Sequence, residues 1–92
     1  MTTKHSPERV IRAQASGIAA IIKAAERGDK IDVKFAKAIE EARTKETFKV
    51  GVVMDDKVIK VDLPWATIRE TSEKGLTEFI VGLMLETRNT VN

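Results

Sequence analysis

The chain has 92 residues, of which 42% are hydrophobic and 33% charged, so it is long enough for one folded core and too short for two. It contains no cysteine and a single histidine, which excludes disulfide frameworks and thiolate metal sites and leaves little material for acid–base catalysis. We expect one domain over residues 1–92, with polar ends at 1–6 and 88–92 that fray. No apolar segment marks export or a membrane span, which predicts a cytoplasmic protein.

The first predicted element is a long amphipathic helix over residues 7–27. Ser6 supplies an N-cap hydroxyl, Pro7 suits the first helical position, and Gly28 provides a stop signal. Apolar residues recur between these signals at spacings of three and four. One flank carries small side chains, namely Ala13, Gly17, Ala20 and Ala24. We expect this strip to pack against another element of the same chain, and a dimer seam is the alternative.

A second helix is predicted directly after Asp32, which is a suitable N-cap, and should end near Thr44. Its apolar residues are expected to be buried, and they are Phe35, Ala38, Ile39 and Ala42. The short connection at Gly28 makes the two helices antiparallel or steeply crossed neighbours.

Beyond the second helix the apolar period changes to two, which is typical of β-strands. Two alternating segments, 48–54 and 57–63, are separated by Asp55-Asp56, and Asp tolerates the left-handed backbone of a tight turn. With this pair as the loop, Val52 faces Ile59 in an antiparallel hairpin. The other expected pairs are Met54 with Lys57, Val50 with Val61, Phe48 with Leu63, and Lys49 with Asp62.

Pro64 ends the second strand because it lacks the backbone donor, and residues 64–68 are predicted as a short helical turn, with an edge strand as the alternative. Thr71 or Ser72 caps the last helix. The apolar stripe of this helix should lie on the hairpin or on the first helix, and consists of Leu76, Phe79, Ile80, Leu83 and Met84. The predicted fold is therefore α+β: two N-terminal helices, a two-stranded antiparallel hairpin, a short helical turn and a C-terminal helix around one core.

Residues suited to catalysis do not form a recognisable set. His5 lies in the polar N-terminus, and Asp55-Asp56 lacks the further oxygen ligands that a hard cation needs. The glycines never cluster into a phosphate-binding loop. We therefore expect no enzyme, no cofactor and no metal site. Trp65 is predicted to be a core residue with its indole N–H bonded, and an interface anchor is the alternative.

Charge is unevenly placed along the chain. Residues 1–46 carry ten Lys or Arg against seven Asp or Glu, a balance of +3, whereas residues 47–92 carry six against seven, a balance of −1. At about 100° per residue, several cations of the first helix share one face, and lysines beyond Gly28 extend it. This cationic ridge comprises Arg9, Arg12, Lys23, Arg27, Lys30 and Lys34. It is either a solvated face or a surface that attracts phosphates or an acidic protein.

The small size, the lack of a catalytic set and the charge on one helical face resemble small proteins of phages and mobile elements, of which anti-CRISPR inhibitors are the best-known group. This resemblance implies a non-catalytic protein that docks on a host nucleoprotein effector and blocks its nucleic-acid site. The partner would then be a protein or ribonucleoprotein complex, with direct nucleic-acid contact allowed.

Two alternatives remain at this stage. The element order is similar to that of winged-helix DNA-binding domains, in which helices precede a β-hairpin wing, although Glu40 and Glu41 stand beside Lys34 on the expected reading helix and disfavour phosphates. An antitoxin-type partner subunit is the other alternative, in which the small-residue strip forms a homodimer.

Overall fold

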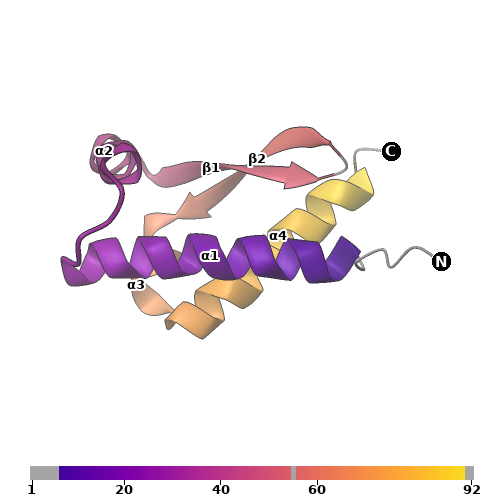
Figure 1. Ribbon diagram of the computed structural model, residues 1–92, viewed down its shortest axis with the longest axis horizontal. Coiled ribbons are helices and arrows are strands. Elements are labelled where there is room, and N and C mark those ends of the chain that lie inside the picture. The colour runs from indigo at the N-terminus through magenta and orange to yellow at the C-terminus, as the bar shows by residue number, and fades with distance from the viewer. Residues whose placement is uncertain (1–6, 55, 91–92) are drawn as a thin grey trace.

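The computed structural model describes residues 7–54 and 56–90, and it has the predicted α+β arrangement with the elements in the predicted order (Figure 1). The elements are α1 (Pro7–Arg27), α2 (Val33–Ala42), β1 (Thr47–Met54), β2 (Lys57–Pro64), α3 (Trp65–Glu70) and α4 (Glu73–Thr90). The predicted fraying of residues 1–6 and of residues 91–92 lies outside the described residues, as does His5; residues 88–90 belong to α4.

α1 has the bounds that its end signals predict, and Gly28 directly after it has a positive φ of 85°, the conformation that favours glycine at a helix end. The Asp32 carboxylate caps α2 by accepting a hydrogen bond of 2.8 Å from the backbone N–H of Lys34. α2 ends at Ala42, slightly before the predicted Thr44. Figure 1 shows α2 end-on while α1 runs across the view, so the two helices cross steeply, as predicted.

The hairpin has the predicted register at every pair, including Val52 with Ile59 and Lys49 with Asp62. β1 and β2 form a sheet of two strands. Asp56 has a φ of 65°, the left-handed conformation expected of the turn, and Asp55 lies outside the described residues. The alternation of apolar residues therefore determines which face of the hairpin is buried.

Residues after Pro64 form the helical turn α3, which confirms that interpretation over an edge strand. Trp65 is a core residue, 4% exposed, and its indole Nε1 donates a hydrogen bond of 2.8 Å to the carbonyl of Ala42. Its ring stacks on Phe48 with centroids 5.6 Å apart. Trp65 thereby joins the end of α2 to β1 and α3, and it is not available as a surface anchor.

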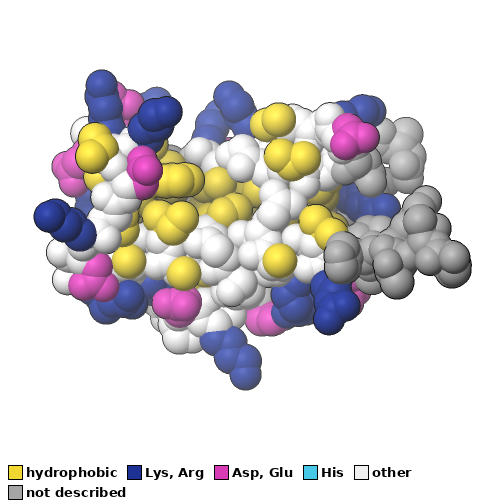
Figure 2. Space-filling model, viewed as in Figure 1, with side chains coloured by type: hydrophobic (Ala, Val, Ile, Leu, Met, Phe, Trp, Pro, Cys, Tyr) yellow, Lys and Arg dark blue, Asp and Glu magenta, His cyan; other side chains and the backbone are white. Residues whose placement is uncertain are grey.

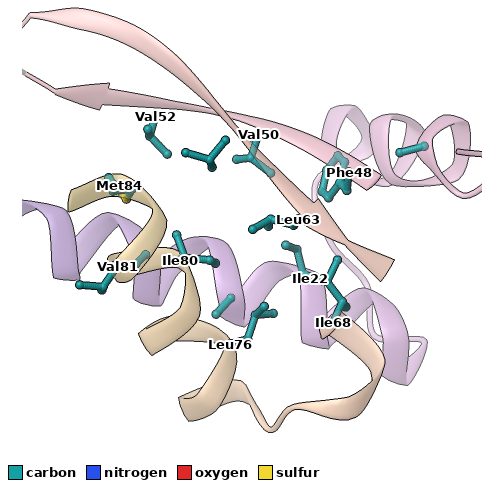
Figure 3. Packing of buried hydrophobic residues seen from close by; sticks show 14 of the residues in the cluster. Ile22, Phe48, Val50, Val52, Leu63, Ile68, Leu76, Ile80, Val81 and Met84 are labelled. Atoms are coloured by element: carbon teal, nitrogen blue, oxygen red, sulfur yellow. The ribbon is translucent and has the colours of Figure 1, made fainter. Parts of the chain in front are cut away.

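Ser72, rather than Thr71, caps α4, because its hydroxyl accepts a hydrogen bond of 3.1 Å from the backbone N–H of Gly75. α4 crosses behind α1 and approaches the hairpin (Figure 1). The core lies where the inner hairpin face, α1 and α4 meet (Figure 3). Its largest fully buried side chains are Ile22, Ile39, Val52, Leu63, Ile68, Leu76, Ile80 and Met84. Within residues 7–54 and 56–90, no helix combines the length and apolar character needed to cross a membrane.

Candidate protein-binding face

Among the predicted cationic residues, Arg12, Lys23 and Arg27 are engaged within the chain. Arg12 forms an ion pair with Glu78 of α4, and this hydrogen-bonded carboxylate raises the pKa of the arginine above its ordinary value. Lys23 Nζ donates a hydrogen bond to the backbone carbonyl of Ile68 at the end of α3. These contacts fasten α1 to α3 and α4.

Arg27 is bound in the same way at the end of α1. Its Nε lies 3.1 Å from Asp29 Oδ2, and its Nη1 lies 3.8 Å from Glu73 Oε1 at the start of α4. The remaining predicted residues, Arg9, Lys30 and Lys34, have exposed side chains. The predicted ridge thus contains residues that bind other groups of the chain, although the Arg12 and Arg27 side chains remain 48% and 57% exposed. The other three lie on the first turn of α1, in the loop after it and on α2.

The other side of α1 carries an exposed surface without charge. Its residues share one sector of the helix, in which no Asp, Glu, Lys or Arg occurs. We define them as the outer face: Val10, Ala13, Gly17, Ala20, Ile21 and Ala24. Val10 is 44% exposed, Ala13 and Gly17 are exposed, and the other members are half-buried.

The outer face contains the small-residue strip, and the prediction that this strip packs inside the chain is wrong for its first half, Ala13 and Gly17, which are exposed. A side-chain carbon placed on Gly17 would meet no atom within 4 Å. The reason is that Ala15 and Ala19, on the opposite flank, are fully buried and provide the small surface that the core and α4 need. The periodicity of the sequence shows both flanks but not which of them α4 covers.

A small apolar groove, with a cavity volume of about 20 Å³, continues the outer face toward the hairpin. Its lining comes from α1, α2 and β1, and consists of Ile18, Ile21, Ile22, Phe35, Ile39, Phe48 and Val50. Phe35 was predicted to be buried and is instead 45% exposed, because the groove beside it is not filled by another part of the described chain. Ala38 was also expected to be buried and is exposed.

The outward side of the hairpin adds further exposed apolar area. Val53 and Val58 face each other across the strands and are 54% and 72% exposed. Figure 2 shows hydrophobic side chains gathered between α1 and the hairpin, with Lys, Arg, Asp and Glu mostly around the margin. An apolar centre with a charged border is the usual composition of a protein-binding surface.

Metal-binding side chains do not cluster in the described part of the chain. No group of three or more His, Asp or Glu residues there is arranged to hold a metal ion. The Ser72 hydroxyl is engaged as the N-cap of α4. The apolar surface is therefore the feature of residues 7–54 and 56–90 with the clearest functional character.

The chain matches no protein-family model, no curated protein and no solved structure. We therefore infer its function from the surface that the fold presents.

Proposed function

We propose that this chain is a non-catalytic binding domain that docks on a protein partner through the outer face and the adjoining groove. The observation that carries this proposal is the exposed, uncharged sector of α1 in a chain of which 33% is charged. A solvated helix face ordinarily carries charge, whereas contiguous exposed apolar area is typical of docking surfaces.

In its narrower form, the proposal is that the partner is a host nucleoprotein effector and that the chain is an inhibitor of the anti-CRISPR type, which blocks the nucleic-acid site. The exposed cations support this form, because Arg9 stands at the first turn of α1 while Lys30 and Lys34 follow its last turn. Cations at both ends of an apolar face would attract an acidic protein surface or guide-RNA phosphates and speed association.

Direct nucleic-acid binding has less support as the main function. Arg12, Lys23 and Arg27 already bind groups of neighbouring elements, which reduces the cations available for phosphates. A homodimer is favoured by one observation, since the exposed Ala13 and Gly17 would let a second α1 approach closely.

The test compares two glutamate substitutions on the same helix. Ala13→Glu places a charge on the outer face, and Ser16→Glu places the same charge on the exposed flank that faces α4. We expect both variants to unfold within about 0.5 kcal/mol of the parent chain, because both sites are exposed. Affinity capture from a lysate of the host cells, with and without nuclease, should lose a defined complex with Ala13→Glu and retain it with Ser16→Glu.

The other outcomes separate the alternatives. A complex that survives Ala13→Glu contradicts the proposed face. Capture only of bulk nucleic acid, lost on digestion and on reversal of Arg9, Lys30 and Lys34, moves the nucleic-acid function to first place. A molecular mass that rises with protein concentration and falls to that of the monomer in Ala13→Glu identifies a homodimer.

A further inference from the structure

One edge of β1 is open. β2 pairs with β1 on one side, and on the other side the amide of Gln14 bonds to Val53, donating to its carbonyl at 2.7 Å and accepting from its N–H at 3.0 Å. Val53 thus directs its backbone polar groups away from β2, and the period of the ladder makes Gly51 and Lys49 do the same. Both residues are exposed, and no other described residue bonds to these backbone groups.

The apolar groove lies directly beside this edge. Phe48 and Val50, which line it, alternate along β1 with Lys49 and Gly51. Its cavity volume of about 20 Å³ is far below the roughly 300–1,000 Å³ typical of small-molecule sites. The groove is therefore too small for a cofactor, and its apolar lining is a surface that apolar side chains of a partner can cover.

We infer that the edge and the groove together bind an extended segment of the protein partner, which adds to the sheet as a third strand beside β1. The segment exchanges backbone hydrogen bonds with Lys49 and Gly51, and its alternate side chains cover the apolar lining of the groove. Lys49 is exposed on the outward side of the sheet and favours an acidic residue there. This inference rests on the proposed function, since it names the part of the partner that the surface takes.

One end of the strand-binding site is marked by the side chain of Gln14. Gln14 makes with Val53 the pair of bonds that a peptide group of a neighbouring strand would make, and so it stops the added strand beyond Gly51. Phe35 of α2, 45% exposed, lines the groove beside this site. The ligand is therefore a short segment in which apolar and acidic residues alternate.

A second copy of this chain is a poorer occupant of the edge. Antiparallel pairing of two β1 edges over Lys49 and Gly51 would bring the two Lys49 side chains opposite or diagonal to each other on one face of the sheet. Like charges in these positions are destabilising, whereas an acidic residue of a different protein is attracted.

The probe is an end-capped peptide of sequence Glu-Leu-Glu-Leu-Glu-Leu-Glu, compared with a peptide of equal composition in which the leucines are consecutive. Amide hydrogen exchange of the full chain, measured by NMR, gives the exchange rate of each backbone N–H. Without peptide, the amides of Lys49 and Gly51 should exchange rapidly because they lack a partner. They should exchange about tenfold more slowly when about nine-tenths of the edge is occupied by the alternating peptide.

Gly51→Pro and Gly51→Ala form a matched pair of variants. Proline removes the outward donor of the edge strand without removing a bond to β2, whereas alanine keeps the donor and places a methyl group 3.4 Å from Val58 Cγ1, an ordinary contact. Gly51→Pro should abolish peptide binding and Gly51→Ala should retain it. Lys49→Glu should weaken binding of the glutamate peptide and strengthen binding of a peptide in which lysine replaces each glutamate. This charge-reversal test remains informative if Gly51→Pro fails to fold.

The outcomes of this experiment and of the outer-face test are separable. Absence of protection at about 1 mM peptide, or equal protection by both peptides, overturns the inference. Protection that grows with protein concentration alone assigns the edge to a second copy and also overturns it. If partner capture is retained by Gly51→Pro but lost with Ala13→Glu, the strand site is overturned and the proposed function stands. If capture is retained by Ala13→Glu, the proposed function is overturned.

Discussion

Ala15 and Ala19 on one flank of α1 are fully buried, whereas Ala13 and Gly17 on the opposite flank are exposed. The two flanks are alike in size and helix propensity, and both would allow close approach of another backbone. They differ in what borders them, since the covered flank is edged by Arg12, which is bound to α4. Folding therefore covers one of two equivalent small surfaces and leaves the other exposed.

The largest contrast is expected between two adjacent isoleucines of α1. Ile22 is 2% exposed in the core, so Ile22→Ala should cost about 2–5 kcal/mol of unfolding free energy through lost contacts and a cavity. Ile21 is half-buried at the groove, so Ile21→Ala should cost less than half as much. Urea denaturation measures both, and equal losses would show that the groove is part of the core.

The next largest difference in stability is expected when small side chains on the two flanks of α1 are enlarged. Ala19→Leu inserts atoms into a fully buried site and should cost about 1–3 kcal/mol. Ala13→Leu adds the same atoms to an exposed site and should change stability by no more than about 0.5 kcal/mol. Thermal unfolding resolves the difference, because about 1 kcal/mol moves the midpoint by about 4–8 °C in a domain of this size. Equal shifts would contradict the assignment of α4 to the Ala19 flank.

A smaller effect is expected from the cations of α1. Lys23→Met removes the hydrogen bond to the Ile68 carbonyl and should cost about 1 kcal/mol. Arg9→Gln, at an exposed site, should stay within about 0.5 kcal/mol. Denaturant unfolding of the two variants checks this, and a Lys23 variant as stable as the Arg9 variant would mean that the ridge is uniformly a solvated face.

The smallest effect has the opposite sign. Gly17→Ala and Gly82→Ala each replace a glycine within a helix, and neither new methyl group meets an atom within 4 Å. Each substitution should therefore stabilise the chain by about 0.5–1 kcal/mol. Gly82 lies on α4, outside the outer face. Partner capture should weaken with Gly17→Ala and stay unchanged with Gly82→Ala. Equal capture by both would mean that close approach at Gly17 is not needed.

Elements with local signals are predictable from the sequence. Gly28 marks the end of α1, and the Asp55-Asp56 turn together with the period of two determines the whole register of the hairpin. Local patterns are sufficient there because the deciding residues lie within a few positions of one another.

The binding surface is less predictable because it depends on where distant elements dock. The sequence shows Arg12 and Lys23 on one face of a helix, but not that Glu78 and the Ile68 carbonyl approach them from 66 and 45 residues away. Phe35 belongs to an apolar stripe in the sequence, yet its exposure depends on whether another element fills the groove. The signal present in the sequence is the lack of charge along the Ala13 and Gly17 sector, because a solvated helix face ordinarily carries charge.

Phe48 is part of both the groove and the aromatic stack with Trp65. One part of its ring lines the groove, and its face stacks on Trp65 with an interplanar angle of 9°. Trp65 is the single tryptophan of a chain without tyrosine, so the intrinsic fluorescence of the protein reports on one site. A partner side chain that covers the groove would contact Phe48, whose ring lies against Trp65, so we expect the emission of the unlabelled protein to change when the groove is occupied.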